Sequence, residues 1–334
     1  MIEETMLTPE VRAIISELRG KYIKTERDRA FRGTFDRLLE CDEEGNLIAK
    51  PAKCIATGET RGIVVTAGAG GGKTSLVRHA LKKHPALQPC ETAAMPCVTI
   101  SVPCPATSKS VGKALLKATG VPAKSGNRTA QDIWDDVAFR FKLLGTVVVW
   151  IDEAHDVFPQ SSKSEAPDIL KTLKRLMQGE SAVIVILSGV DRLWTNVCFD
   201  DQVSRRYFPI ALPQVFGATD CKRLWAILGG YCGRAGLEPP ERGDLMERLV
   251  HAGRQRFGRC VEQMIDAIEI ALVRGDAKLD IRHFADAFFA REGCQRRCCV
   301  TLTAGDSHRE SMRLDGSHEQ ASSRPLPHDE LVQP

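Results

Sequence analysis

Residues 63–74 read I-V-V-T-A-G-A-G-G-G-K-T, so that a short apolar strand runs directly into a glycine-rich loop. A helix is expected to follow from Ser75 to His84, where Pro85 ends it. In a loop of this kind, backbone N–H groups wrap closely around phosphate oxygens, and only small residues leave room for that approach. The positive end of the helix dipole favours the same anion. The stretch therefore predicts a phosphate-binding loop.

Two side chains at the end of this loop predict what it binds. Lys73 is expected to reach the β- and γ-phosphates of ATP, and the Thr74 hydroxyl to ligate Mg²⁺. The first position of the G-x4-G-K-T pattern is alanine instead of glycine, which is a small departure. A flexible glycine-rich turn is the alternative, and the flanking strand and helix disfavour it. The expected nucleotide-binding positions are Ala67, Gly68, Ala69, Gly70, Gly71, Gly72, Lys73, Thr74 and Ser75.

The second signal is V-V-V-W-I-D-E-A-H at residues 147–155. A pair of carboxylates at the end of a buried strand is costly unless a ligand uses them. Asp152 is expected to hold Mg²⁺ through water, and Glu153 to polarise the attacking water as general base. Two exposed carboxylates at a strand end are the alternative. Together with the glycine loop, however, the pair predicts one shared site.

Apolar strands alternate with helices through the middle of the chain. Strands are expected at 63–66, 97–102, 147–151, 182–187 and 207–212, with further helices at 108–119, 130–143 and 168–178. The third strand is continuously apolar, as in a strand that is covered on both faces. This alternation predicts an α/β fold with a parallel sheet covered by helices.

The pattern differs on either side of this region. Residues 8–40 read as helical and 41–61 as polar and turn-rich, whereas only helices are expected after Pro213, at 219–235, 241–251, 259–274 and 281–290. From about Glu292 the composition is polar with little periodicity, so we expect disorder. The sequence thus predicts a helical extension and linker at 1–61, an α/β core at 62–213, a helical lid domain at 214–291 and a polar tail at 292–334.

Composition limits the function only loosely. The net charge of +3 is too small to predict nucleic-acid binding, so any basic surface must be local. No stretch approaches 18 uninterrupted apolar residues, and the acidic start does not resemble a signal peptide. We therefore expect a cytoplasmic protein with no membrane partner. The twelve cysteines lack the paired spacing of a zinc site, and we expect reduced thiols.

The phosphate loop, the D-E-A-H after an apolar strand and the helical C-terminal region resemble those of AAA+ ATPases. More narrowly, the chain resembles the TniB/TnsC-type ATPases that regulate DNA transposition. Within residues 8–292, the segments that carry this resemblance are V-V-T-A-G-A-G-G-G-K-T, W-I-D-E-A-H-D-V-F, L-S-G-V-D-R-L-W, D-D-Q-V-S-R-R-Y-F and H-F-A-D-A-F-F. The resemblance implies an ATPase that assembles as a ring or filament on duplex DNA. It also implies recruitment or activation of a transposase and, with a target-selector protein, choice of the target.

The resemblance implies roles for residues outside the two motifs. Ser188, at the end of the fourth strand, matches the sensor-1 polar residue of the family. Arg205 and Arg206 match the region of the arginine finger, which stabilises transition-state charge at the γ-phosphate of a neighbouring subunit. Arg256 or Arg259, at the start of the penultimate helix, matches the sensor-2 arginine. The sequence does not choose within either arginine pair.

Two basic stripes are candidates for DNA contact. One lies on the helix after the second strand and the other opposite the apolar face of the helix at 168–178. In AAA+ rings, helices in these places tend to face the central channel, which implies contacts with phosphates and not with bases. A solvated helix face is the alternative. The stripes are Lys109, Lys113 and Lys117, and Lys171, Lys174 and Arg175.

Two other functions fit the same ATPase residues. A helicase loader or replication-initiation ATPase would share all of them, and its partner would be a helicase instead of a transposase. A nucleotide-dependent signalling or scaffold switch would not act on DNA, and its ATPase activity would not respond to DNA.

Overall fold

A five-stranded, fully parallel sheet lies at the centre of the computed structural model, which describes residues 8–121, 128–157 and 166–293. Along the sheet the order is β4-β5-β6-β3-β7. The strands are β3 (Gly62–Thr66), β4 (Cys97–Ser101), β5 (Val148–Asp152), β6 (Ile184–Gly189) and β7 (Tyr207–Ala211). All five expected strands are present, and the predicted α/β fold is confirmed.

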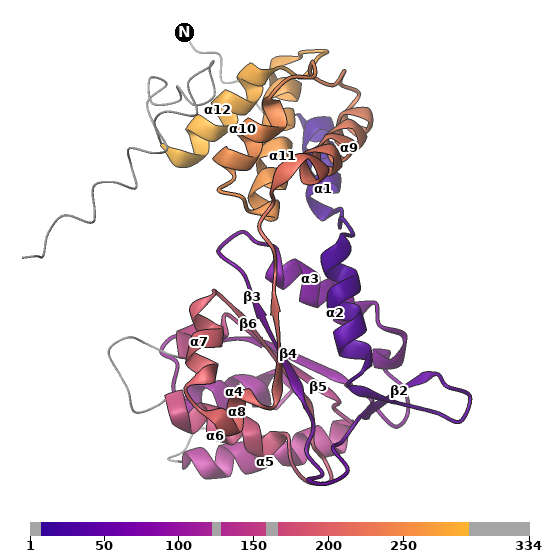
Figure 1. Ribbon diagram of the computed structural model, residues 1–334, viewed down its shortest axis with the longest axis vertical. Coiled ribbons are helices and arrows are strands. Elements are labelled where there is room, and N and C mark those ends of the chain that lie inside the picture. The colour runs from indigo at the N-terminus through magenta and orange to yellow at the C-terminus, as the bar shows by residue number, and fades with distance from the viewer. Residues whose placement is uncertain (1–7, 122–127, 158–165, 294–334) are drawn as a thin grey trace, which may run out of the picture.

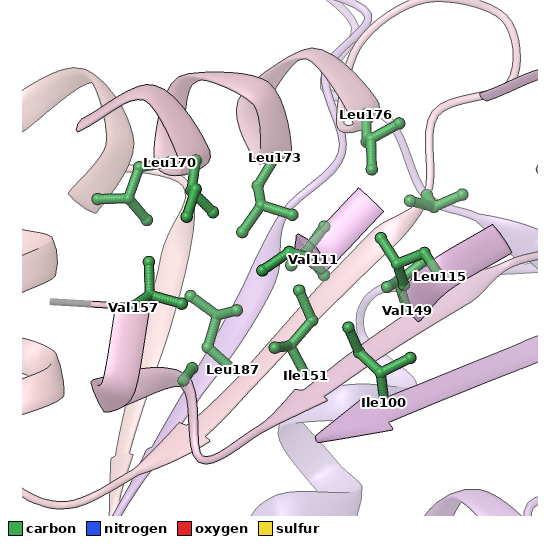
Figure 2. Packing of buried hydrophobic residues seen from close by; sticks show 14 of the residues in the cluster. Ile100, Val111, Leu115, Val149, Ile151, Val157, Leu170, Leu173, Leu176 and Leu187 are labelled. Atoms are coloured by element: carbon green, nitrogen blue, oxygen red, sulfur yellow. The ribbon is translucent and has the colours of Figure 1, made fainter. Parts of the chain in front are cut away.

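Helices cover both faces of this sheet (Figure 1). Alternate residues of β5 belong to two different cores, Val149 and Ile151 to one and Val148 and Trp150 to the other. Figure 2 shows the first of these cores, in which the leucines of α6 pack over the sheet. The first face carries α4 (Ser108–Ala118), α5 (Ala130–Leu144), α6 (Ala166–Leu176), α7 (Arg192–Cys198) and α8 (Asp201–Ser204), and the second carries α2 (Glu26–Asp36) and α3 (Lys73–Lys82).

The segment expected to be helical over residues 8–40 is in fact two helices followed by a hairpin. After α1 (Pro9–Gly20) the chain leaves the helix, and α2 begins anew at Thr25. The Asp28 carboxylate accepts the Thr25 N–H at 2.7 Å, which completes a capping box. The hairpin of β1 (Leu39–Cys41) and β2 (Leu47–Pro51) occupies part of the expected linker, and its strands are antiparallel.

The C-terminal region is entirely helical within the described residues, as expected. It contains α9 (Gly217–Ala235), α10 (Leu245–Ala252), α11 (Phe257–Arg274) and α12 (Ile281–Glu292). We call these four helices the lid. The N-terminal helix α1 lies among them (Figure 1), and its Ile15 and Leu18 share a core with Leu228, Met264 and Ile268. The residues before β3 are therefore divided, since α1 packs in the lid and α2 packs on the α/β core.

Not all of the chain is described by the structure. Residues 294–334, with Cys294, Cys298 and Cys299, lie outside the described ranges. The nine cysteines inside those ranges form no disulfide with one another. None of the helices that can be described combines the length and apolarity that a bilayer crossing requires.

Candidate nucleotide site

The glycine loop adopts a backbone that only small residues allow. Gly70 and Gly72 have φ values of +75° and +90°, in the left-handed region that favours glycine. Gly71 is required for a different reason, because a Cβ there would lie 2.6 Å from the Cβ of Ala67. Alanine therefore fits the first position of the motif only while Gly71 has no side chain.

The two sequence motifs meet at the carboxyl ends of the strands. Thr74 Oγ1 donates to Asp152 Oδ2 at 2.7 Å, although the two residues lie 78 positions apart in the chain. Asp152 is the last residue of β5 and is 8 % exposed. Lys73 is buried, and its Nζ donates to the Ala67 carbonyl at 3.1 Å. The structure thus brings together the side chains that the sequence assigns to the phosphates and to Mg²⁺.

A chain of buried hydrogen bonds fixes the Asp152 carboxylate. Ser188 Oγ, at the end of β6, donates to Asp152 Oδ1 at 2.6 Å. Trp150 Nε1 in turn donates to Ser188 Oγ at 2.8 Å, and both residues are almost completely buried. Trp150 was not singled out from the sequence, where a tryptophan in an apolar strand gives no polar signal. The position of Ser188 beside Asp152 makes it a support for that carboxylate.

Glu153 lies directly after the strand in an unusual backbone conformation. Its φ is +54°, in the left-handed region that residues other than glycine rarely adopt. Such residues cost about 1–3 kcal/mol and cluster at functional sites. The Glu153 side chain is 41 % exposed, and its Oε2 lies 3.1 Å from His155 Nδ1. The conformation therefore places a part-exposed carboxylate next to the buried Asp152.

The first turn of α11 packs directly on the glycine loop. A Cβ at Gly68 would lie 2.4 Å from the Arg256 guanidinium carbon, and one at Gly70 would lie 2.7 Å from Arg259 Cγ. Gly258 permits this approach, because a Cβ on it would lie 2.5 Å from the Gly70 carbonyl oxygen. Both candidate sensor-2 arginines thus contact the loop. The role of Gly258 was not visible in the sequence.

The two lid arginines differ in their partners. Arg259 Nη2 lies 3.6 Å from Glu292 Oε1, so its charged group is directed along the lid. The Arg256 guanidinium forms neither a hydrogen bond nor an ion pair with any residue of the described ranges. Of the two, Arg256 offers an unpaired cation at the loop.

A cavity of about 570 Å³ adjoins the loop. Most of its lining comes from the segment that joins α1 to α2, from the phosphate loop with the start of α3, and from α11 of the lid. Its walls include Tyr22, Ile23, Ser75, Phe257 and Ile265. This volume lies within the usual range for small-ligand sites.

The candidate finger residues lie at the opposite end of the sheet. The Arg206 carbonyl accepts the N–H of Gly62, the first residue of β3, whereas the loop follows the last residue of that strand. Arg206 is buried and ion-paired with Glu59, while Arg205 is 61 % exposed and lies 3.5 Å from the same carboxylate. The hydrogen bond from Gln178 lowers the pKa of the Glu59 carboxyl, and Arg206 and Arg205 lower it further, while partial burial opposes them. Arg205 is therefore the member of the pair that can extend from the surface.

The two basic stripes differ in whether their cations have partners. Lys109, Lys113 and Lys117 on α4 are exposed and have no hydrogen-bond or ion-pair partner within the described ranges. On α6, Lys174 donates to Gln202 at 2.7 Å and Arg175 donates to Gln131 at 2.9 Å. The α4 stripe is thus the better candidate for binding an external anion.

Comparisons with known proteins agree with this architecture. The family model described as "Bacterial TniB protein" matches residues 47–216. No curated protein matches the chain. Among solved structures, the Orc1 protein of Aeropyrum pernix in complex with DNA is 15 % identical, with a TM-score of 0.56 over 86 % of this chain and 67 % of that chain.

Two further solved structures show the same fold. The Orc2 protein of Aeropyrum pernix in its ADPNP–ADP complexes is 16 % identical, with a TM-score of 0.58 over 84 % of this chain and 73 % of that one. Cdc6p of Pyrobaculum aerophilum is 15 % identical, with a TM-score of 0.58 over 83 % and 70 %. At these identities the likeness establishes the AAA+ P-loop fold alone. Since the family match covers half of the chain and includes the phosphate loop and the Asp152–Glu153 pair, the chain belongs to the TniB family.

Proposed function

We propose that this chain hydrolyses ATP to ADP and phosphate at the carboxyl end of its sheet. The observation that carries the proposal is the 2.7 Å hydrogen bond from Thr74 to Asp152, the two side chains expected to hold Mg²⁺. A hydroxyl and a carboxylate are hard oxygen donors that suit this ion, whose remaining ligands are waters and substrate phosphates. Thr74 and Asp152 would hold the ion at the phosphate loop, where it would supply positive charge to offset the charge that develops on the phosphates during transfer.

Residues of this chain supply the remaining roles. Lys73 exchanges its bond with the Ala67 carbonyl for phosphate oxygens, and Glu153 accepts a proton from the attacking water as general base. Ser188 keeps the Asp152 carboxylate in place. We assign the sensor-2 role to Arg256, because its guanidinium lies against Gly68 and has no partner in the described part of the chain.

We assign the nucleoside of ATP to the cavity beside the loop. Its walls combine apolar side chains, such as Ile23, Leu212 and Phe257, with the backbone of Gly71 and Gly72. A flat base fits such a largely apolar space, while the phosphates extend over the start of α3.

Arg205 is the proposed arginine finger. It lies at the amino end of the sheet, so it would act on the site of a neighbouring copy and not on its own. A finger of this kind stabilises the transition-state charge on the γ-phosphate. The complete site would then require an assembly of this chain, either a ring or a filament.

The biological role that we propose is regulation of DNA transposition from the cytoplasm. The TniB family match supports this role, and the exposed α4 stripe offers three cations to the backbone of duplex DNA. ATP-controlled assembly on DNA would recruit or activate a transposase and, with a target selector, help to choose the target. Hydrolysis would then release the assembly.

Assembly on DNA can be tested by electron microscopy and sedimentation with duplex DNA and a non-hydrolysable ATP analogue. Rings or filaments that require both ligands are expected, and their absence with every nucleotide would argue for the signalling switch. Replacing Lys109 and Lys113 by glutamate should weaken DNA binding at least tenfold and reduce its salt dependence. Glutamates at Lys82 and Lys83, which are exposed at the end of α3 on the other face of the sheet, are the matched control.

The partner separates the two DNA-related functions. Co-purification with a transposase encoded in the same genome would support the proposal, whereas co-purification with a helicase would favour a loader. Orc1 of Aeropyrum pernix, a solved protein of the same fold, is bound to DNA, which keeps the second outcome worth testing.

A further inference from the structure

Arg27 belongs to α2, outside both sequence motifs, yet it contacts the glycine loop, the connection to the lid and the lid itself. Its Nη1 donates to the Gly71 carbonyl at 3.1 Å. Its Nη2 donates to the Pro213 carbonyl at 2.6 Å, at the point where the α/β core passes into the lid. Its guanidinium carbon lies 5.3 Å from the ring centroid of Phe257, the first residue of α11. One side chain thus links the loop, the lid connection and the lid.

The contact with Gly71 restrains a peptide of the loop that, on the proposed function, binds the phosphates. Because a peptide unit is planar and trans, the Gly71 carbonyl and the Gly72 N–H point in opposite directions from one rigid plane. Holding the carbonyl from outside therefore aims the N–H toward the inside of the loop. Glycine has little barrier to other backbone conformations, so this peptide needs an external restraint. A cationic donor on the carbonyl also strengthens the N–H as a donor.

The contacts with the lid make this restraint depend on the lid position. Phe257 is followed by Gly258, whose close approach to Gly70 sets the distance between α11 and the loop. A lid that moved away would carry the Phe257 ring with it and shift the connection at Pro213. Arg27 would then lose two of its three partners.

Arg27 lies in a partly buried and positively charged environment. Burial lowers the pKa of its guanidinium, Asp220 opposes this effect, and the nearby cations Arg223 and Arg256 add to it.

We infer that Arg27 is a positioning residue that transmits the position of the lid to the phosphate loop. With the lid closed, Arg27 holds the Gly71–Gly72 peptide in the orientation that binds the β-phosphate. With the lid open, the peptide is released and affinity falls. This inference rests on the proposed nucleotide binding at residues 67–74.

The first test measures affinities of Arg27→Ala and Arg27→Lys for ATP and ADP by fluorescence titration with Mg²⁺. Arg27→Ala should lose roughly tenfold for both nucleotides in the same ratio, because the peptide serves a phosphate that both carry. Arg27→Lys should recover only part of this, since one ammonium cannot reach two carbonyls and the ring together. Arg29→Ala should bind normally, because it removes an exposed arginine of the same helix whose one ion-pair partner among the described residues is Glu26.

The outcomes separate the inference from its premise. Unchanged affinity in both Arg27 variants overturns it, and so does a loss confined to ATP, which would make Arg27 a direct γ-phosphate contact. Wild-type protein that binds neither nucleotide would instead remove the proposed nucleotide site. Thermal unfolding without nucleotide identifies a variant that fails to fold. If Arg27→Ala does not fold, the affinities of Arg27→Lys decide the test.

The second test measures coupling to the lid with a double-mutant cycle of Arg27→Ala and Phe257→Leu on ADP affinity. Phe257 is expected to act partly through Arg27. The fold-loss of ADP affinity in the double variant should therefore be clearly smaller than the product of the fold-losses in the two single variants. Losses that simply multiply would show that the lid and Arg27 act independently, and would overturn the coupling.

Discussion

The two ends of the parallel sheet hold their charged residues in different states. At the carboxyl end, within the described residues, Lys73 bonds only the Ala67 carbonyl and Arg256 has no partner, while Arg259 pairs with Glu292 of the lid. At the amino end, Arg206 and Arg205 share the carboxylate of Glu59. Cations without carboxylate partners carry uncompensated positive charge that an anionic ligand can neutralise. The charge of the paired arginines is already compensated by Glu59. On the proposed function, each subunit would bind the phosphates with its own loop and supply its arginine finger to the site of a neighbour.

The largest effect is expected at the carboxyl end, from Glu153→Gln. The amide cannot accept the proton of the attacking water, so the rate of hydrolysis should fall on the order of 10³-fold. Nucleotide affinity should stay near that of the wild type, since the loop and Asp152 are intact. Phosphate release and nucleotide titration check both statements. A variant that hydrolyses ATP at half the normal rate or faster would place the general base elsewhere.

Arg205→Ala tests the amino end and is expected to lower hydrolysis on the order of 10²-fold without changing stability. The decisive measurement is a mixture with Lys73→Ala, which is expected to be inactive alone. If the finger acts on a neighbour, mixed assemblies regain activity, because one variant keeps its loop and the other its finger. No recovery in assemblies shown to contain both chains would mean that Arg205 has no role between subunits.

Arg206→Ala should act on stability instead. Its removal leaves the mostly buried Glu59 short of its principal cation, which typically costs about 3 kcal/mol of unfolding free energy. Urea unfolding measures the loss. Combining Arg206→Met with Glu59→Gln removes both charges and should restore most of the stability. If Arg206→Ala were stable but impaired in hydrolysis, Arg206 would be the arginine finger and Arg205 would not.

Gly258→Ala is expected to have the smallest effect and to separate lid position from stability. Gly258 lies in the first turn of α11, where alanine favours the helix by about 1 kcal/mol. Its Cβ, however, would lie 2.5 Å from the Gly70 carbonyl, so α11 must move away from the loop. Nucleotide affinity should fall roughly fivefold while the melting temperature is maintained. Gly230→Ala in α9, where a Cβ meets nothing within 4 Å, is the control.

The sequence predicted what short segments encode. The loop at 67–74 and the pair at 152–153 have local chemical reasons for their residue types, and the strands that carry them are uniformly apolar. The hairpin at 39–51 was missed, because its short strands are mixed in character and lie among polar turn residues. The helices α7 and α8 were missed as well, since they are too short for a clear apolar period.

Other parts of the site depend on contacts between distant segments. The difference between Arg205 and Arg206 depends on Glu59, which lies almost 150 positions away. Arg27 lies in a polar, charge-rich segment, E-R-D-R, and nothing in the sequence distinguishes it from neighbouring charged residues that face the solvent. Its role exists only because the loop and the lid meet beside it. Such assignments require the tertiary structure, since no local pattern encodes them.

The position of α1 in the lid has a consequence for how the protein is made. Arg19 of α1 donates to Glu269 of α11, 250 residues later in the chain. At the usual rate of translation of about 5–20 residues per second, α1 waits roughly 12–50 s for this partner. Until α9 has been made, the apolar side chains of Ile15 and Leu18 have none of their lid partners. A growing chain can thus complete its α/β core on the ribosome before the lid helices that pack against α1 have been synthesised.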